Sequence, residues 1–515
     1  MSTPSRKKIL NSSISSIFIL LAFLVAINFL ALQNSVYFDL TEEKIYTTSE
    51  ATKDILKGLK GEVSVNFYIS KDLPSDLINA KTQLADLMNQ YQDIAGSKLK
   101  VSYGEPENTP EKVQELGEKG IPQIQFNVIE KDKYEVKQGF FGVEITSGKD
   151  SELKREAIPI IQAIDGWEYD FISAVYSVSR EQKEVLAFLA GHGEKNIQLP
   201  DLIKSYDVLN VEIETVGDNK GFYISNSADE QKSEQVEKTF VTPVTLVIIA
   251  PSEKITSEEI AIIDEFMTDG GNVIVASESV VPDLQNNLNA GNVENNINEF
   301  TKRYGIQINS DLVYDASNSN ITYQQGFFSV SKAYPFWVKA LQDNFEQHPS
   351  LSGVQSVLFP WASSLTVSES DSYSAKPLIK STNQAKTMAE NYNLLPDAKF
   401  SFAGGGQKTI VAISEPKDKD SKKGILFVAG DSDFISPNFS QQIPDNKTFF
   451  MNLIESVSNS VNLASIRSKN IIDRPLKELD ESKKNYWKFF AIFSGAILVD
   501  VYGVVRIMRR RKRNR

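Results

Sequence analysis

The sequence predicts an α/β protein whose large central region lies between two transmembrane helices, one at each end of the chain. Three observations lead to this fold class. An apolar run occurs near each terminus, several short central strands are apolar at every position, and these strands alternate with segments of helical periodicity. Strands that are apolar throughout are typical of open, mostly parallel sheets with both faces covered.

The first predicted transmembrane helix covers residues 9–32. It contains no charged residue, and the basic residues 6–8 precede it. About 20 residues at roughly 1.5 Å rise cross a hydrocarbon core about 30 Å thick, so the run is long enough to span. Its exit, Phe29 to Leu32, lacks the small residues of a signal-peptide cleavage site. We therefore expect an uncleaved anchor behind a cytoplasmic tail at residues 1–8.

The second predicted transmembrane helix covers residues 487–508 and ends in a basic tail at 509–515. Basic flanks stay in the cytoplasm, so both termini are expected there. This topology predicts a protein of the cytoplasmic (inner) membrane with two spans and a periplasmic or extracellular ectodomain. Asp500 lies within the second span, where a carboxylate is costly unless it is paired. It either contacts a transmembrane partner or lies close enough to the basic end to reach water.

Composition narrows the function. The formal net charge is −12, and because the tails are basic, the region between them is more acidic still, which argues against a nucleic-acid partner. The chain has no cysteine, which excludes disulfides, thiolate catalysis and zinc–thiolate sites. Only two histidines are present, so a metalloprotease motif with paired histidines is excluded. The sequence predicts no cofactor and no metal site.

The first predicted domain, residues 33–180, begins with a helix and then follows the order βαβαββα. Its elements are expected at 47–59, 63–69, 74–94, 98–103, 111–118, 123–129, 134–145 and 169–178, the first with capping-box spacing. That order, with Gly120-Ile121-Pro122 leading into a strand, resembles a thioredoxin-like domain. The redox Cys-x-x-Cys motif of that fold is absent, so the resemblance implies only the scaffold.

The second predicted domain, residues 181–465, is the open, mostly parallel α/β sheet domain. Its strands are expected at 185–189, 208–215, 246–250, 272–276, 410–413 and 424–430, with helices at 257–267 and 446–457. Residues 218–238 are polar and read as a loop. Asn/Ser-rich excursions with two aromatic patches fill about 279–395, and a charged linker at 466–486 leads to the second span.

Polar residues follow two of the predicted strands. His192 and Glu194 follow one, and Asp431 and Asp433 follow another. Carboxyl ends of parallel strands meet at one edge of a sheet, so the four residues are a candidate ligand cleft, or an acid/base or metal cluster. The alternative is structural, because Gly-His-Gly-Glu suits a tight turn and Asp-Ser-Asp commonly caps the segment after a strand. No complete catalytic set is present, so no catalytic residue is assigned.

Several short motifs together resemble the GldG family of ABC transporter auxiliary proteins, some of which are associated with gliding motility. They are Tyr37-Phe-Asp-Leu-Thr41, Tyr46-Thr-Thr-Ser49, Gly191-His-Gly-Glu194, Gly270-Gly271, His348-Pro349 and Gly430-Asp-Ser-Asp-Phe434. The resemblance implies an ABC permease and a separate cytoplasmic ATPase as partners. It also implies that the sheet domain is glutamine-amidotransferase-like, without the cysteine nucleophile.

The leading hypothesis is a non-enzymatic, membrane-anchored accessory subunit of an ABC transporter complex, whose ectodomain binds a small-molecule substrate or an envelope protein. Two rival hypotheses stay open. The chain could be an extracytoplasmic hydrolase or metal-dependent enzyme acting through the His192 cleft, or a structural envelope protein.

Overall fold

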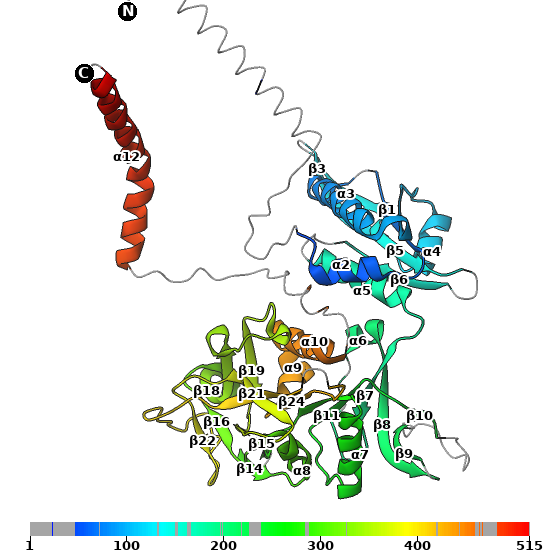
Figure 1. Ribbon diagram of the computed structural model, residues 1–515, viewed down its shortest axis with the longest axis vertical. Coiled ribbons are helices and arrows are strands. Elements are labelled where there is room, and N and C mark those ends of the chain that lie inside the picture. The colour runs from blue at the N-terminus through cyan, green and yellow to red at the C-terminus, as the bar shows by residue number, and fades with distance from the viewer. Residues whose placement is uncertain are drawn as a thin grey trace, which may run out of the picture. The chain divides into compact units, whose positions relative to one another are not determined.

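The structure is a computed structural model that describes Phe23 and residues 47–513, with gaps at 72, 131–132, 150–152, 162–165, 196, 198, 218, 226–237, 284–287, 326, 419–420, 442, 459–462, 464–465 and 467–480. The chain divides into two units, residues 1–470 and residues 471–515 (Figure 1). Each unit is described by itself.

A four-stranded sheet of order β2-β1-β5-β6 lies in the N-terminal part of the first unit. Strand β1 (Val63–Ile69) pairs in parallel with β2 (Leu99–Gly104) and antiparallel with β5 (Phe141–Ser147). Strand β5 also pairs antiparallel with β6 (Lys154–Ile158). Every second side chain of β1 is fully buried, because successive side chains of a strand point to opposite faces of the sheet.

Helices complete this part of the fold. They are α2 (Glu50–Gly58), α3 (Ser75–Ala95), the 3-10 turn η1 (Gly96–Lys98), α4 (Pro110–Glu118) and α5 (Trp167–Ser179). Helix α2 begins after Ser49, whose Oγ accepts a hydrogen bond from the backbone N–H of Thr52 at 3.1 Å. Phe67 of β1, Trp167 and Phe171 of α5 and Tyr91 of α3 are buried together, and their neighbouring ring centroids lie 5.3 to 5.9 Å apart.

One predicted strand of this region is divided in the structure. Residues 134–145 were expected to form a single strand, but among the described residues β4 (Lys133–Gly139) pairs only with β3 (Ile124–Glu130), and β5 begins after Phe140. The backbone N–H of Phe140 donates to Ser70 Oγ at 2.9 Å. A Cβ at Gly139 would lie 2.7 Å from that oxygen, so the close approach requires glycine. The contact with Ser70 therefore ends one strand and starts the next.

The rest of the first unit is organised around an eleven-stranded sheet (Figure 1). Its path runs β10 (Phe240–Val241), β9 (Asn219–Ile224), β8 (Tyr206–Val216), β7 (Glu184–Leu189), β11 (Thr245–Ile249), β12 (Asn272–Ala276), β24 (Leu426–Ala429), β23 (Thr409–Pro416), β20 (Leu365–Val367) and β15 (Ile306–Ile308), and β21 (Tyr373–Lys380) pairs with β23. The five strands β8, β7, β11, β12 and β24 are parallel. Strand β9 lies in the segment 218–238 that was expected to be a loop.

Helices cover both faces of this sheet, which explains why its central strands are apolar at every position. Side chains of α6 (Pro200–Ser205) and α10 (Pro444–Ser458) pack on one face, and those of α7 (Ser257–Thr268) and α8 (Ile297–Thr301) on the other. Every residue of β11 and β12 is buried. Burial on both faces requires apolar side chains at successive positions.

The Asn/Ser-rich segment, predicted as excursions from the sheet, contributes β15, β20 and β21 to the large sheet and otherwise contains small sheets and turns. They comprise β13 (Val280–Asp283) with β14 (Asn289–Asn292), β16 (Leu312–Tyr314) with β22 (Lys386–Met388), the three-stranded sheet β17 (Asn318–Gln325), β18 (Phe328–Leu341) and β19 (Ser356–Pro360), and the 3-10 turns η3 (Lys302–Tyr304), η4 (Gln342–Asn344) and η5 (Pro349–Leu351). The turn η6 (Asp433–Ile435) and helix α9 (Pro437–Ser440) follow β24. The predicted aromatic patch around Tyr334 lies largely within a hydrophobic core, because Tyr334 and Phe336 are buried.

The second unit contains α12 (Glu481–Arg513), where the second transmembrane helix was predicted. In the part of the chain that the structure describes, no helix combines the length and the apolar character that crossing a membrane requires. In α12 the uncharged run from Phe489 ends before Asp500, and it covers only about 16 Å at the helical rise, roughly half of a hydrocarbon core. The prediction of two terminal transmembrane helices is therefore wrong.

The location deduced from those helices is wrong as well, because the inner-membrane topology with an outer ectodomain depended on the two spans. The predicted first span, residues 9–32, lies outside the described residues apart from Phe23. The backbone of Asp500 belongs to α12, but its side chain lies outside the described residues. Its contact with a partner stays a prediction that the structure does not test.

Candidate functional site

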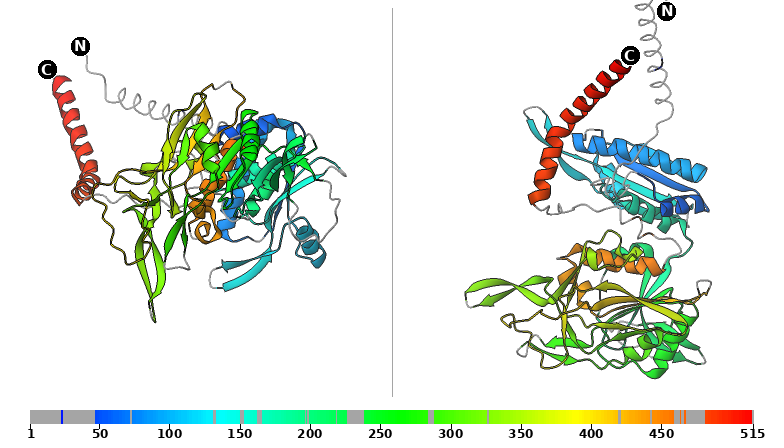
Figure 2. Two further views of the ribbon diagram at one scale, coloured as in Figure 1. Left: turned by 90° about the horizontal axis from the view of Figure 1, so that it is seen from below. Right: turned by 60° about the vertical axis from the view of Figure 1, so that its left-hand side comes forward.

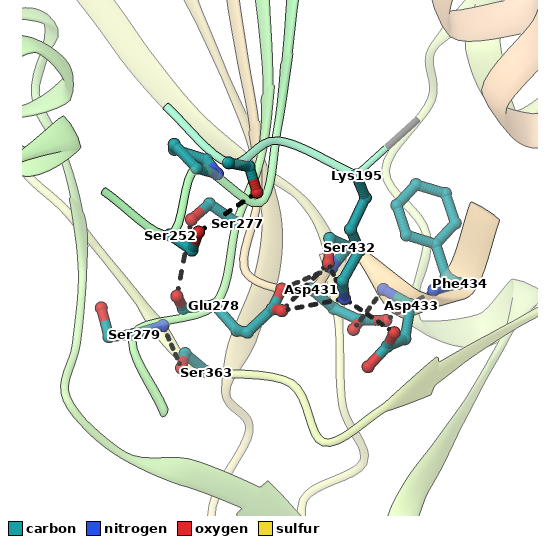
Figure 3. A network of polar contacts seen from close by, with 12 residues as sticks. Lys195, Ser252, Ser277, Glu278, Ser279, Ser363, Asp431, Ser432, Asp433 and Phe434 are labelled. Atoms are coloured by element: carbon teal, nitrogen blue, oxygen red, sulfur yellow. Dashed lines mark hydrogen bonds and ion pairs between the residues drawn. The ribbon is translucent and has the colours of Figure 1, made fainter. Parts of the chain in front are cut away.

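The candidate site lies at the carboxyl edge of the large sheet. The segments after β7, β12 and β24 bring Lys195, Glu278 and Ser432 together from distant parts of the sequence (Figure 3). Parallel strands all end at the same edge, which explains why these residues meet.

Two glycines shape the loops at this edge. Gly191 has φ of +105°, a backbone conformation that favours glycine. At Gly430 a Cβ would lie 2.1 Å from the carbonyl oxygen of Ser363, while the backbone N–H of Ser363 donates to the Gly430 carbonyl at 2.7 Å. The two glycines therefore set the path of the chain next to the polar residues.

His192 lies between two carboxylates. Its Nδ1 is 3.1 Å from Glu194 Oε1, and its Nε2 is 3.2 Å from Glu259 Oε1. An acceptor at each ring nitrogen favours the doubly protonated imidazolium. The hydrogen bond to Glu194 raises the pKa of His192, burial opposes this, and the charge of Glu259 adds to the rise. His192 therefore joins the loop after β7 to the first turn of α7 through two carboxylate contacts that favour its protonated form.

Glu259 also belongs to the cap of α7. The backbone N–H of Glu259 donates to Thr256 Oγ1 at 3.3 Å, and the backbone N–H of Thr256 donates to Glu259 Oε2 at 2.8 Å. In α/β proteins that bind nucleotides, a phosphate occupies this kind of helix N-terminus. Here Glu259 places a negative charge there, and burial raises its pKa less than the Thr256 hydrogen bonds and His192 lower it. The arrangement disfavours a bound phosphate.

Lys195 is held by three acceptors. Its Nζ lies 2.8 Å from Ser432 Oγ, 2.9 Å from Asp433 Oδ1 and 3.3 Å from Glu278 Oε1 (Figure 3). An ammonium group has three N–H donors, so these contacts use its full donor capacity. The Glu278 side chain is only 3% exposed, and its Oε2 accepts from the backbone N–H of Ser432 at 2.8 Å. We call Lys195, Glu278, Ser432 and Asp433 the lysine cluster.

A serine hydroxyl beside a lysine amine can form a nucleophile and its general base. The lysine cluster lacks both properties that such chemistry needs. Burial lowers the pKa of Lys195, but the charges of Glu278 and Asp433 outweigh it and the net shift is upward, so the amine keeps its proton. Ser432 is fully buried and its Oγ donates to Glu278 Oε1 at 3.0 Å. The hydroxyl is therefore neither deprotonated nor accessible to a substrate.

Asp431 caps the turn that follows β24. Its Oδ1 accepts from the backbone N–H of Asp433 at 3.0 Å, and its Oδ2 accepts from that of Phe434 at 3.2 Å. Asp431 is completely buried. Burial raises the pKa of its carboxyl group, and the nearby charges of Asp433 and Glu278 act in the same direction. The geometry matches the structural alternative for the Asp-Ser-Asp motif.

The four predicted site residues fall into two pairs. His192 contacts Glu194, and Asp431 contacts Asp433, whereas the hydrogen bonds and ion pairs among the described residues include none that joins one pair to the other. Sequence reasoning missed the residues that organise the edge, namely Lys195, Glu259, Glu278 and Ser432. Glu278 could have been found by the same rule as the others, because it also follows a buried strand. Lys195 gave no signal beyond its place next to Glu194.

The lysine cluster does not suit a metal ion. Among the described residues, no group of three or more His, Asp and Glu side chains has the arrangement that could hold one. In the cluster, the Lys195 ammonium occupies the space between Glu278 and Asp433 that a cation would need.

His348, from the predicted His-Pro motif, lies in a different place. It borders a surface hollow of about 720 Å³, together with Phe345, Leu351 and other residues of 342–354. Its Nδ1 accepts from the backbone N–H of Ser350 at 3.1 Å. Burial lowers the pKa of His348, which favours the neutral ring, whereas the pKa of His192 is raised. The motif therefore caps a turn beside the hollow.

Fold and site define an acidic α/β protein whose sheet edge is filled by its own charged side chains. Residues 183–463 match the family model described as an ABC-type uncharacterized transport system. Because the match covers more than half of the chain, the chain belongs to this family of ABC transporter auxiliary proteins and has an accessory role in an ABC transport system. Residues 42–146 also match a domain of unknown function, DUF7088.

A relative and two solved structures are similar to the chain. An uncharacterized protein of Borreliella burgdorferi is 23% identical over 500 residues, which cover 92% of this chain and 94% of the relative. The mmIFT52 N-terminal domain is 16% identical, with a TM-score of 0.34 over 53% of this chain and 96% of that domain. The exo-β-1,4-mannosidase Op5Man5 from Opitutaceae bacterium strain TAV5 is 11% identical, with a TM-score of 0.20 over 74% of this chain and 50% of the enzyme. Both scores are too low to carry an argument.

Proposed function

We propose that this chain is a non-enzymatic accessory subunit of GldG type, which acts with a permease and a separate ATPase of an ABC transport system. The family match supports the accessory role. The observation that carries the non-enzymatic part is the state of the lysine cluster, in which the amine keeps its proton and the Ser432 hydroxyl is buried. A group that neither reaches a substrate nor accepts a proton cannot start nucleophilic catalysis.

The partner proposal is tested by purifying the tagged full chain from its own organism in mild detergent. A permease and an ATPase should copurify in fixed ratios to the chain. A matched purification from cells that carry the tag on an unrelated protein is the control. Isolation of the chain without either subunit, under conditions that keep other ABC complexes intact, would contradict the proposal.

Two substitutions distinguish the proposed function from the enzyme alternative. Under the proposed function, His192→Ala and Ser432→Ala should both keep the transport phenotype of the organism, provided that melting temperatures show folded protein. Under an enzymatic function, one of them should abolish the phenotype while the fold stays intact. That second result would overturn the non-enzymatic assignment.

The resemblance to GldG supports a finer version of the proposal, in which the transport system serves gliding motility. Deletion of the gene in a gliding organism should then stop gliding, and the full chain supplied from a plasmid should restore it. Normal gliding after deletion would exclude this finer role and leave the accessory role untouched.

A further inference from the structure

Residues 318–331 of the β17–β18 hairpin combine an exposed aromatic tip with an unpaired strand edge, and we call this segment the finger. In both views of Figure 2 the lime-green hairpin projects from the sheet domain. Phe327 and Phe328 lie at its tip and are 102% and 75% exposed. Single exposed apolar residues are ordinary, but two adjacent aromatic rings at the end of a projecting hairpin form an apolar surface that solvent disfavours.

The finger also has an open strand edge. Strand β17 is the outer strand in the order β17-β18-β19, so its outward backbone N–H and C=O groups have no strand partner in that sheet. Natural sheets protect such edges with charged residues, prolines or bulges. The chain has no charged residue and no proline from 316 to 331, and the register irregularity lies at the base, between Asn318 and Ser319. The protection is therefore missing along most of β17.

The two faces of β17 show that a further strand can be added without disturbing the core. Ile321 and Tyr323 point toward the domain and are half-buried, whereas Asn320, Thr322 and Gln324 are exposed. Pairing at the outer edge would keep this alternation, because strands pair in the plane of the sheet.

We propose that the finger binds the finger of a second copy of this chain, with β17 antiparallel to β17, in a two-fold symmetric dimer. Antiparallel pairing of identical strands is self-complementary, as a two-fold interface requires. Charge permits this pairing, because residues 316–331 carry no charge, so two fingers can meet without the repulsion that a formal net charge of −12 causes between two copies elsewhere.

The area is sufficient for a stable dimer. Each aromatic side chain can bury roughly 150 to 250 Å². Antiparallel pairing places the tip of each finger beside the base of the other finger, where two rings and a strand edge of eight residues bury on the order of 600 Å² in each copy. This gives roughly 1,200 Å² in total, at the lower end of stable protein interfaces.

Sedimentation of the purified full chain tests the proposal. The wild-type chain should sediment as a dimer whose population rises with concentration. The double substitution Phe327→Ser and Phe328→Ser should raise the dissociation constant at least about 100-fold, because four rings lose their burial. Thr322→Lys at the middle of β17 should also yield monomers, because it places like charges on the paired edges. Val136→Ser, which removes an exposed apolar side chain on β4, is the matched control and should leave the dimer unchanged.

Melting temperatures and the oligomeric state together distinguish loss of the dimer from loss of the fold. Unchanged melting temperatures of the variants show that monomers do not result from unfolding, since the two rings lie outside any core. A monomeric wild-type chain, or a dimer that survives both edge and tip substitutions, overturns the proposal. A monomeric wild-type chain that binds vesicles of uncharged phosphatidylcholine through Phe327 and Phe328 would instead assign the finger to a lipid surface.

Discussion

The carboxyl edge of the large sheet and the finger differ in whether their functional groups have partners within the protein. At the sheet edge, Lys195 and His192 lie among carboxylates, and each uses its donors inside the protein. At the finger, Phe327 and Phe328 are exposed, and among the described residues no strand pairs with the outer edge of β17. The sequence suggested the reverse, because the edge carries motifs that are typical of sites and the finger lies in an Asn/Ser-rich segment. A motif rich in polar groups can therefore be fully paired within the protein, and a segment without any such motif can expose an apolar surface to solvent.

Among the substitutions that test this comparison, that of Lys195 should change the free energy of unfolding most. Lys195→Met leaves Glu278 buried without its cation, and we expect the free energy of unfolding to fall by about 2 to 3 kcal/mol, a value reduced because the lysine side chain is 40% exposed. Urea denaturation measures the change. In the double variant with Glu278→Gln, part of the loss should return. A stable single variant would show that the cluster does not lock the edge.

Removal of the Asp431 cap should come next. Asp431→Ala leaves the backbone N–H groups of Asp433 and Phe434 without their acceptor, which should cost about 2 kcal/mol. Asp431→Asn is the matched control and should cost less, because its amide oxygen still accepts one of the two hydrogen bonds. Denaturation at neutral pH checks both. Equal losses in the two variants would mean that the carboxyl group has a role other than capping.

The His192 contact predicts a pH dependence. The pKa of His192 is raised in the folded protein, so its contribution to stability is complete below the ordinary value of 6.5 and is lost as the pH rises through the folded pKa. The pKa of Glu194 is lowered, because hydrogen bonds from His192 outweigh the effect of burial, so its contribution is lost only in acid. Unfolding free energies should therefore decline by about 1 kcal/mol or less from about pH 6 to pH 8.

A matched pair of variants isolates that decline. His192→Gln should flatten the dependence on pH above neutrality, whereas His348→Gln should preserve the decline, because burial lowers the pKa of His348 and gives that residue the opposite slope. A decline of equal size in the His192 variant would assign the pH dependence to another group.

The smallest effect on stability is expected at the finger. Phe327→Ser should change the free energy of unfolding of the monomer by less than about 0.5 kcal/mol, because the ring is fully exposed. The measurement is thermal or urea denaturation at a concentration below dimer formation. A loss of 2 kcal/mol or more would show that the ring packs within the domain, and the contrast between finger and edge would disappear.

Local sequence patterns predicted many elements of the fold well. The alternation of Val63 to Ile69 gave a strand with the bounds of β1, and the apolar runs of β11 and β12 predicted strands buried on both faces. The boundary at Phe140 could not be predicted, because it depends on a hydrogen bond to Ser70, which is distant in sequence. The thioredoxin-like and glutamine-amidotransferase-like assignments stay predictions.

The sequence by itself determined the α/β character, the acidic surface and the absence of thiol chemistry, because these follow from composition and from periodicity along the chain. It also placed His192 and Asp431 after strands. Only the tertiary structure decided that Lys195, Glu278 and Ser432 meet, that the edge is closed and that the finger is open. The physical reason is that Lys195, Glu278 and Ser432 meet through contacts between residues more than 80 positions apart, and that exposure depends on the packing of the whole domain, neither of which a local pattern records.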